Sequence, residues 1–196
     1  MKQLALGISP PPQPTLDNFV PGANAELLAR LRELRAGTFP ESVLYLWGEP
    51  GSGKSHLLQG CAGPNVVDDV EALDEAAQIG LFNAINEARQ SGGAVLAAGS
   101  APPAQLPLRE DLKSRLAWGL VYQVKPPSDE QRALFLHAEA GRRGMRLPDE
   151  VVAYLLSRMR RDLRSLTAVL DQLDRYSLDT KRPFTLPLVR EALKQT

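Results

Sequence analysis

The sequence predicts an α/β protein in which helices flank a parallel sheet and a small group of helices follows the sheet. Three observations lead to this prediction. Short apolar runs of strand length alternate with helical patterns in the first two thirds of the chain, which is typical of parallel sheets with crossover connections. A glycine-rich loop joins the first strand to a helix. After Pro127 only helical patterns occur, so we expect the last third to be helical.

The elements of the sheet region follow from periodicity. A helix is predicted from Asn24 to Gly37, because leucines recur on one face and glycine commonly ends a helix. A second helix opens at 55–59, directly after the glycine-rich loop. A third covers 75–90, with Ala76, Ile79, Phe82, Ile85 and Asn86 spaced along it. Strands are predicted at 42–47, 66–67, 94–98 and 120–124. Those at 42–47 and 94–98 are continuous apolar runs and are expected to be buried on both faces.

The helices after Pro127 begin at residues that favour helix starts. Ser128 can cap a helix with Glu130 and Gln131 in its first turn, and glycines at 141 and 144 interrupt it. Further helices start at Pro148, cover 162–178 and open near 185–187. We therefore expect a proline-rich flexible tail at 1–16, an α/β domain at 17–126 and a small helical lid at 127–196.

Composition excludes several classes of function. The chain has 196 residues and a formal net charge of zero, which argues against sequence-specific binding of DNA by the chain alone, since such binding needs a basic surface. His56, His137 and Cys61 are too few to build a zinc site. A single cysteine fits a reducing cytosol, and no apolar run has the length of a membrane span. We expect a cytoplasmic protein with no membrane contact.

The glycine-rich loop matches the phosphate-binding P-loop, with a strand before it and a helix after it. Its glycines let backbone N–H groups turn toward phosphates. Lys54 is expected to reach the β and γ phosphates and the Ser55 hydroxyl to ligate Mg²⁺. The alternative is a plain glycine turn at a strand end, which the complete pattern in this context disfavours. The predicted nucleotide-binding residues of this loop are Glu49, Pro50, Gly51, Ser52, Gly53, Lys54, Ser55 and His56.

Two acids follow the short strand at 66–67. In P-loop enzymes one acid at a strand end holds the metal and a neighbouring group orients the attacking water. We assign the metal to Asp68, together with Ser55, and the catalytic role to Asp69. The alternative is an acidic surface turn or a helix N-cap, which aspartate also favours.

With these motifs in place, the chain resembles the initiator clade of AAA+ ATPases, and within it the Hda family, small paralogues of the bacterial replication initiator DnaA. The resemblance covers nearly the whole chain. The arginine-containing segment before Trp118 is its most distinctive part, whereas the P-loop alone would fit many families. The segments that carry the resemblance are Leu16–Val20, Gly48–Ser55, Val66–Glu71, Leu112–Leu120, Leu163–Leu166 and Leu170–Arg175.

The resemblance implies roles for particular residues. Asn18, Phe19 and Val20 would flank the adenine. Arg115 would be an arginine finger that is presented to the nucleotide of a neighbouring subunit, and Arg164 a lid arginine that contacts the nucleotide bound in cis. Both roles ask a planar guanidinium to neutralise charge on phosphate oxygens. The alternative for either arginine is a solvated helix face.

The first residues resemble the short peptide with which Hda proteins and many polymerases bind the sliding clamp. The segment is Gln3-Leu4-Ala5-Leu6-Gly7-Ile8. Its glutamine would hydrogen-bond a pocket that Leu4, Leu6 and Ile8 fill, and the prolines at 10–14 would act as a semi-rigid spacer. The terminal aromatic residue usual in such peptides is absent.

The sequence departs from the family in two places. Only about ten residues separate the P-loop helix from Asp68, barely enough for one crossover between parallel strands. We therefore expect the sheet to be one strand short at one edge. Ser100 stands at the sensor position after the strand at 94–98, where related proteins carry an acid. We expect weak or no intrinsic ATP hydrolysis.

The favoured function is a regulatory adaptor that inactivates DnaA. The protein would bind ADP or ATP with Mg²⁺, dock on the DNA-loaded sliding clamp, and present Arg115 to ATP held by DnaA, which restrains replication initiation. It would contact DNA only through the clamp, and self-association is left open. One alternative is a self-contained ATPase that loads or remodels a helicase or transposition complex. Another is a degenerate P-loop domain that serves only as a binding surface.

Overall fold

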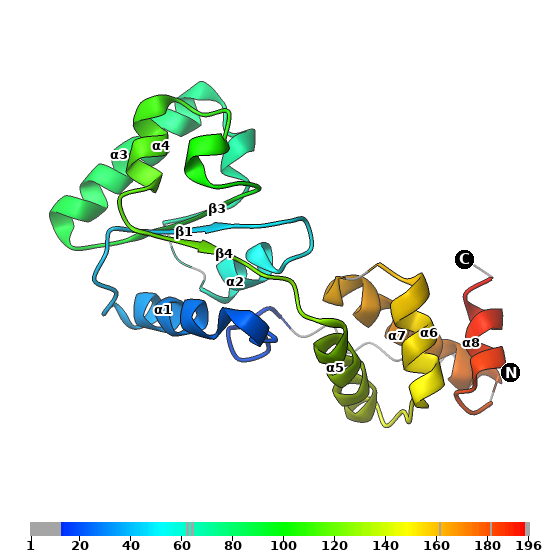
Figure 1. Ribbon diagram of the computed structural model, residues 1–196. Helices are drawn as coiled ribbons and strands as arrows, with labels where there is room; N and C mark the ends of the chain where they lie inside the picture. The colour runs from blue at the N-terminus through cyan, green and yellow to red at the C-terminus, as the bar shows by residue number, and fades with distance from the viewer. Residues whose placement is uncertain (1–12, 62, 64, 161, 181, 195–196) are drawn as a thin grey trace, which may run out of the picture.

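The computed structural model describes residues 13–61, 63, 65–160, 162–180 and 182–194. Figure 1 shows an α/β body followed by a group of helices. In the α/β body, 3-10 turns η1 (Gly22–Asn24), η2 (Val70–Ala72) and η3 (Pro103–Gln105) accompany four strands and four helices. These are α1 (Ala25–Ala36), β1 (Val43–Trp47), α2 (Lys54–Gly60), β2 (Val66–Val67), α3 (Glu75–Ser91), β3 (Val95–Gly99), α4 (Glu110–Leu116) and β4 (Leu120–Gln123).

The four strands form one parallel sheet in the order β2-β3-β1-β4. Because successive side chains of a strand point to opposite faces, β1 contributes to two separate cores. Leu44 and Leu46 pack with α1 and α2, and Val43 and Tyr45 pack with α3 and α4. Figure 1 shows these two helix pairs on opposite faces of the sheet. The predicted α/β fold is confirmed.

One edge of the sheet is very short. After α2 the chain reaches β2 within a few residues, and β2 pairs only with β3, through Val66 and Val67. The described part of this connection holds no further strand or helix. The sheet therefore has the shortened edge that the spacing between Ser55 and Asp68 predicts.

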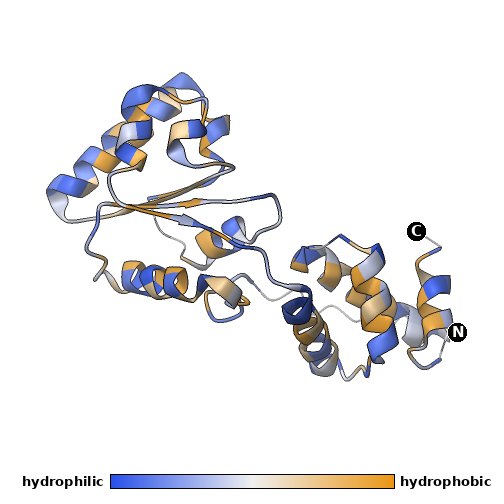
Figure 2. Cartoon of the chain, in the orientation of Figure 1, coloured by the Kyte–Doolittle hydropathy of each residue, from blue (hydrophilic) through white to orange (hydrophobic). Residues whose placement is uncertain are grey.

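The helices after Pro127 surround a hydrophobic core of their own. Ser128 and Gln131 form a capping box at the start of α5 (Asp129–Arg142), as expected from the sequence. Figure 2 shows apolar residues on the facing sides of these helices, where the buried Leu155 and Leu166 lie. The remaining helices are α6 (Asp149–Arg158), α7 (Leu163–Thr180) and α8 (Leu186–Ala192).

Two local features differ from the sequence-based expectation. Helix α4 was not predicted, although Leu112 and Leu116 are fully buried at the i, i+4 spacing of an amphipathic helix. In α3, the buried positions are Leu81, Ile85 and Ala88, while Ile79 is 41% exposed. The apolar stripe of α3 is narrow, so spacing alone did not identify the packed face. Within the described residues, no helix combines the length and apolarity needed to cross a bilayer.

Candidate nucleotide-binding site

The loop between β1 and α2 has the backbone of a phosphate cradle. Gly51 and Gly53 have φ angles of 80° and 106°, values that residues with a Cβ adopt only at a cost. A Cβ on Gly53 would lie 2.7 Å from Cε2 of Phe19, and one on Gly51 would lie 3.0 Å from Cβ of Asp162. The two glycines are therefore required both by conformation and by close neighbours.

Lys54 holds its ammonium group inside this loop. Its Nζ donates hydrogen bonds to the carbonyl oxygens of Gly48 at 2.7 Å and Glu49 at 3.2 Å, and the residue is 9% exposed. The hydroxyl of Ser52 is buried and has no hydrogen-bond partner among the described residues. A buried cation held by two carbonyls beside a buried orphan hydroxyl suits a phosphate group, which accepts from both. The residues present fit the phosphates of a nucleotide.

The predicted metal-binding acids lie at the same edge of the sheet. Asp68 and Asp69 directly follow β2, and the carboxyl ends of parallel strands share one edge. The backbone N–H of Asp69 donates to Oδ1 of Asp68 at 3.0 Å, and Asp69 has a positive φ of 48° that turns the chain into η2. Asp68 is half-buried, whereas Asp69 and Ser55 are exposed. Carboxylate and hydroxyl oxygens are suitable Mg²⁺ ligands, while the described residues contain no cluster of three or more metal-binding side chains.

Sequence reasoning assigned no role to Glu71, which joins this acidic segment to the end of β3. Its Oε1 accepts a hydrogen bond from the backbone N–H of Ser100 at 2.9 Å, and its Oε2 is buried without a partner in the described chain. Burial, and to a smaller extent the Glu71 charge, raise the pKa of Tyr45, whose hydroxyl donates to the carbonyl of Ala101 at 2.8 Å. The Ser100 residue is exposed, and the hydrogen bond to Glu71 is made by its backbone N–H and not by its hydroxyl. An acid two positions after the paired aspartates was the available sequence signal.

On the other side of the cradle lies the segment predicted to flank the adenine. The rings of Phe19 and His56 are in tilted contact, with centroids 5.6 Å apart and an angle of 56° between their planes, and His56 Nε2 lies 3.0 Å from the carbonyl oxygen of Thr15. Asn18 directs its amide to its own segment: Oδ1 accepts from Thr15 N–H and Nδ2 donates to Gln13. The structure thus brings Phe19 and His56 to the cradle, with Asn18 and Val20 beside them in the chain.

The start of α7 approaches the cradle from the helical region. Asp162 caps α7 by accepting hydrogen bonds from the backbone N–H and the hydroxyl of Ser165, both at 2.8 Å. Burial pushes the pKa of Asp162 upward, but these hydrogen bonds outweigh it and the pKa is lowered. Asp162 lies next to Gly51, and Arg164, two residues further along the chain, is exposed.

Arg115 lies at the opposite edge of the sheet from the cradle, where the strands have their amino ends. It is near the end of α4, three residues before Trp118, and β4 then begins beside the start of β1. Its Nε donates to Oδ1 of Asn86 at 2.9 Å, and its guanidinium carbon lies 3.6 Å from the centroid of the Trp118 ring. Strand β1 has five residues, so about 16 Å of strand separates the two edges. The predicted finger and the predicted cradle are therefore not brought together within one chain.

The predicted clamp-binding residues Gln3, Leu4, Leu6 and Ile8 lie outside the described residues.

Comparison with known proteins agrees with this architecture. Residues 129–193 match the family model of the Hda lid domain, so the resemblance to Hda drawn from the sequence is confirmed for the helical region. Domain III of the replication initiation protein DnaA from Thermotoga maritima superposes with a TM-score of 0.77 at 23% identity, covering 94% of this chain and 97% of that chain.

Two further solved structures show the same fold at lower identity. AMPPCP-bound DnaA from Aquifex aeolicus has a TM-score of 0.69 at 21% identity, covering 82% of this chain and 65% of that chain. The Thermotoga maritima RuvB Holliday junction branch migration motor has a TM-score of 0.71 at 17% identity, covering 93% and 72%. The chain therefore has the AAA+ fold, with a four-stranded parallel sheet flanked by helices.

Proposed function

We propose that this chain is a nucleotide-binding regulator of replication initiation that inactivates DnaA by stimulating hydrolysis of DnaA-bound ATP. The observation that carries the proposal is the position of Arg115. It lies at the edge of the sheet away from its own cradle, so it can act only on a nucleotide held by another subunit. The match of residues 129–193 to the Hda lid domain supports this reading.

The chain's own nucleotide, ADP or ATP with Mg²⁺, would bind in the cradle. Lys54 and the backbone of the loop would hold its phosphates, Phe19 and His56 would border its base, and Arg164 would approach from α7. A bound nucleotide would bridge the cradle and α7 by electrostatic contacts, and Mg²⁺, held by Ser55 and Asp68, would neutralise phosphate charge. Nucleotide binding by a DnaA of the same fold supports this assignment.

Arg115 has the environment of a positioned finger. Asn86 occupies Nε and Trp118 supports one face of the guanidinium, while no described residue accepts a hydrogen bond from the two terminal nitrogens. These nitrogens form the fork that suits phosphate oxygens. In the proposed complex they would neutralise charge that develops on the phosphates of ATP bound to DnaA, an effect worth about 10³–10⁵ in rate for fingers supplied in trans.

The tail would bring this activity to replicating DNA. We infer that Gln3, Leu4, Leu6 and Ile8 bind the sliding clamp and that the following prolines space the clamp from the folded body. Docking would raise the local concentration of the protein near DnaA on DNA. The chain's own hydrolysis would remain weak or absent, since its finger is too far away to reach its own nucleotide.

The deciding experiment is single-turnover hydrolysis of ATP pre-bound to DnaA, with and without this protein, the sliding clamp and DNA. We expect stimulation that needs the clamp and that falls about 10³-fold in Arg115→Ala. Arg146→Ala is the matched control, because Arg146 is an exposed arginine in the helical region with no ion pair among the described residues.

Each failure has a separate meaning. Undiminished stimulation by Arg115→Ala would refute the finger. Stimulation that persists after Gln3→Ala, Leu4→Ala and Ile8→Ala together would refute the tether. Strong DNA-dependent hydrolysis by this chain alone would refute the adaptor function and favour a self-contained ATPase.

A further inference from the structure

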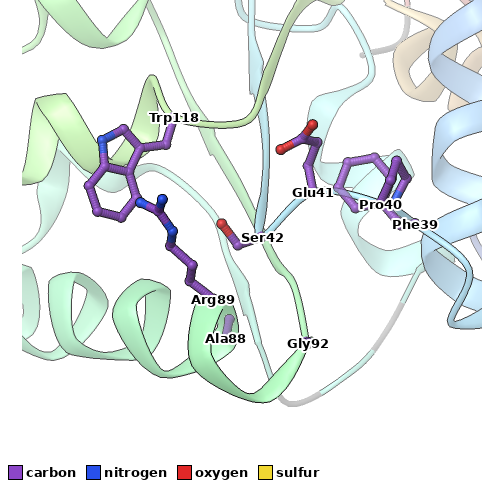
Figure 3. A pocket seen from close by; sticks show the side chains of 9 residues that line it. Phe39, Pro40, Glu41, Ser42, Ala88, Arg89, Gly92 and Trp118 are labelled. Carbon is purple, nitrogen blue, oxygen red and sulfur yellow. The ribbon is translucent and has the colours of Figure 1, made fainter.

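A second arginine shares the indole ring that supports Arg115. The guanidinium carbon of Arg89, in the last turns of α3, lies 4.3 Å from the centroid of the Trp118 ring, and that of Arg115 lies 3.6 Å from it. The two guanidinium carbons can therefore be no further apart than the sum of these distances. Figure 3 shows the Arg89 side chain extending from its helix toward the indole of Trp118, with its guanidinium end at the ring.

Neither cation is neutralised by a neighbouring acid. Among the described residues, neither Arg89 nor Arg115 forms an ion pair, although arginines elsewhere in the same part of the chain, Arg30 and Arg109, do. The groups around Arg115 are neutral: Asn86, Phe82 and Trp118. Two close positive charges repel each other, and a cation–π contact at an exposed site offsets only about 0.5–1 kcal/mol. No described acid offsets the two charges, which leaves both guanidinium groups available to an anion.

The ring that organises the pair borders an open pocket. Trp118 is 37% exposed and lines a pocket of about 420 Å³ together with Arg89, Ser42, Gly93 and Glu41. These residues precede β1, β3 and β4, so the pocket opens at the edge of the sheet opposite the cradle. Glu41 lines this pocket but pairs with neither arginine. The pocket is open to solvent, and Arg115, which does not line it, contacts the Trp118 ring that does.

We propose that Arg89 and Arg115, which both contact the Trp118 ring, form a two-arginine clamp for the phosphates of the nucleotide bound to the partner AAA+ subunit. This inference rests on the proposed function and adds Arg89 as a second phosphate-binding residue and Trp118 as the residue that positions both. Two planar guanidinium forks suit a chain of linked phosphates, where one fork can bind each phosphate group. A nucleic-acid backbone is less suitable, because such binding needs a longer series of cations and the chain has no net positive charge.

The first test measures anion binding without any partner. Trp118 emission is recorded in the full chain carrying Trp47→Phe, which leaves one indole, and Lys54→Ala, which disables the chain's own cradle. Added tripolyphosphate should change the emission as the guanidinium groups turn from the ring to the anion. Arg89→Ala should weaken the apparent affinity by about ten- to a hundredfold, the range of a lost charge-assisted hydrogen bond, and Arg146→Ala should not change it.

The second test measures stimulation of DnaA-bound ATP hydrolysis. Arg89→Ala should lower stimulation by about ten- to a hundredfold, less than Arg115→Ala, and Arg89→Lys should restore part of it because the charge is kept while the fork is lost. Trp118→Leu should lower stimulation although both arginines remain. Adding Arg115→Lys to that variant should not restore the lost stimulation.

The outcomes separate the inference from the proposed function. Normal stimulation by Arg89→Ala, with Arg115→Ala inactive, would overturn the clamp and leave the function standing. Wild-type protein that binds tripolyphosphate through Arg89 but never stimulates DnaA would overturn the assignment to a partner's nucleotide. No response of Trp118 to tripolyphosphate would overturn the clamp, as would a response to a single-stranded oligonucleotide at concentrations where tripolyphosphate has no effect.

Discussion

The two edges of the sheet are built differently. At the carboxyl ends of the strands the phosphate cradle is formed mainly by the backbone of one loop, whereas at the amino ends side chains from separate segments of the chain contact one another. The cradle depends on eight consecutive residues, three of them glycines with positive φ, and the ammonium group of Lys54 donates hydrogen bonds to carbonyl oxygens within the loop. The other edge joins α3 and α4 through Arg89, Arg115 and Trp118; Arg89 is exposed and Arg115 half-buried. The first arrangement suits a ligand that the chain keeps, and the second suits a ligand that a partner brings.

The largest expected effect tests whether nucleotide binding in the cradle is independent of Arg115 at the opposite edge. With MgADP at about 100 times its Kd, the nucleotide should raise the free energy of unfolding by about 2.7 kcal/mol in the wild type. Lys54→Ala should abolish this increase, and Arg115→Ala should retain it, because Arg115 lies too far from the cradle. Differential scanning fluorimetry with and without MgADP measures both. A lost increase in Arg115→Ala would mean that the edges are coupled.

A pair of glycine variants distinguishes conformational strain from steric contact. Gly53 and Gly92 both have positive φ, but a Cβ on Gly92 meets nothing within 4 Å, whereas one on Gly53 meets Phe19 at 2.7 Å. Gly92→Ala should cost about 1–2 kcal/mol from backbone strain alone. Gly53→Ala should cost more, because Phe19 must also move. Urea unfolding compares the two, and equal costs would show that the Phe19 contact is unimportant.

The hydrogen bond between Glu71 and Ser100 should contribute to the stability of the cradle edge. Glu71→Ala leaves the backbone N–H of Ser100 without its acceptor and should lower the free energy of unfolding by about 1–3 kcal/mol. Ser100→Ala is the matched control, since it keeps that N–H and removes only the exposed hydroxyl. If Ser100→Ala were as destabilising as Glu71→Ala, the hydroxyl and not the backbone would be the important group.

The smallest effect concerns the core beneath the cradle. Burial raises the pKa of the Cys61 thiol to about 11, against a weaker lowering effect of Arg35. Because the thiol ionises first in the unfolded chain, stability should fall as pH rises from about 9 toward 11. Between pH 8 and pH 10 the wild type should lose roughly 1 kcal/mol more than Cys61→Ala does. Parallel losses in urea unfolding would show that Cys61 is not buried as a neutral thiol.

Much of the cradle edge was predictable from the sequence. The residues from Gly48 to Ser55 are contiguous, and glycine positions, a strand before and a helix after are local properties that one chain segment contains. Strand β1, the capping box at Ser128 and the short β2 edge follow in the same way from local patterns and spacing. Helix α4 was missed because it is a short segment that also carries the arginine motif.

The opposite edge was decided by the tertiary structure. Arg89 and Trp118 are 29 positions apart in the chain, and nothing in the spacing places the guanidinium of α3 on the indole that follows α4. Likewise, the carboxylate of Glu71 reaches Ser100 only because β2 pairs with β3. The sequence by itself determined the α/β fold and the phosphate cradle, since both depend on local backbone preferences and on periodic burial. Only the packing of α3 against α4 decided that Arg89 and Arg115 contact the same indole ring, because that depends on contacts between residues distant in the chain.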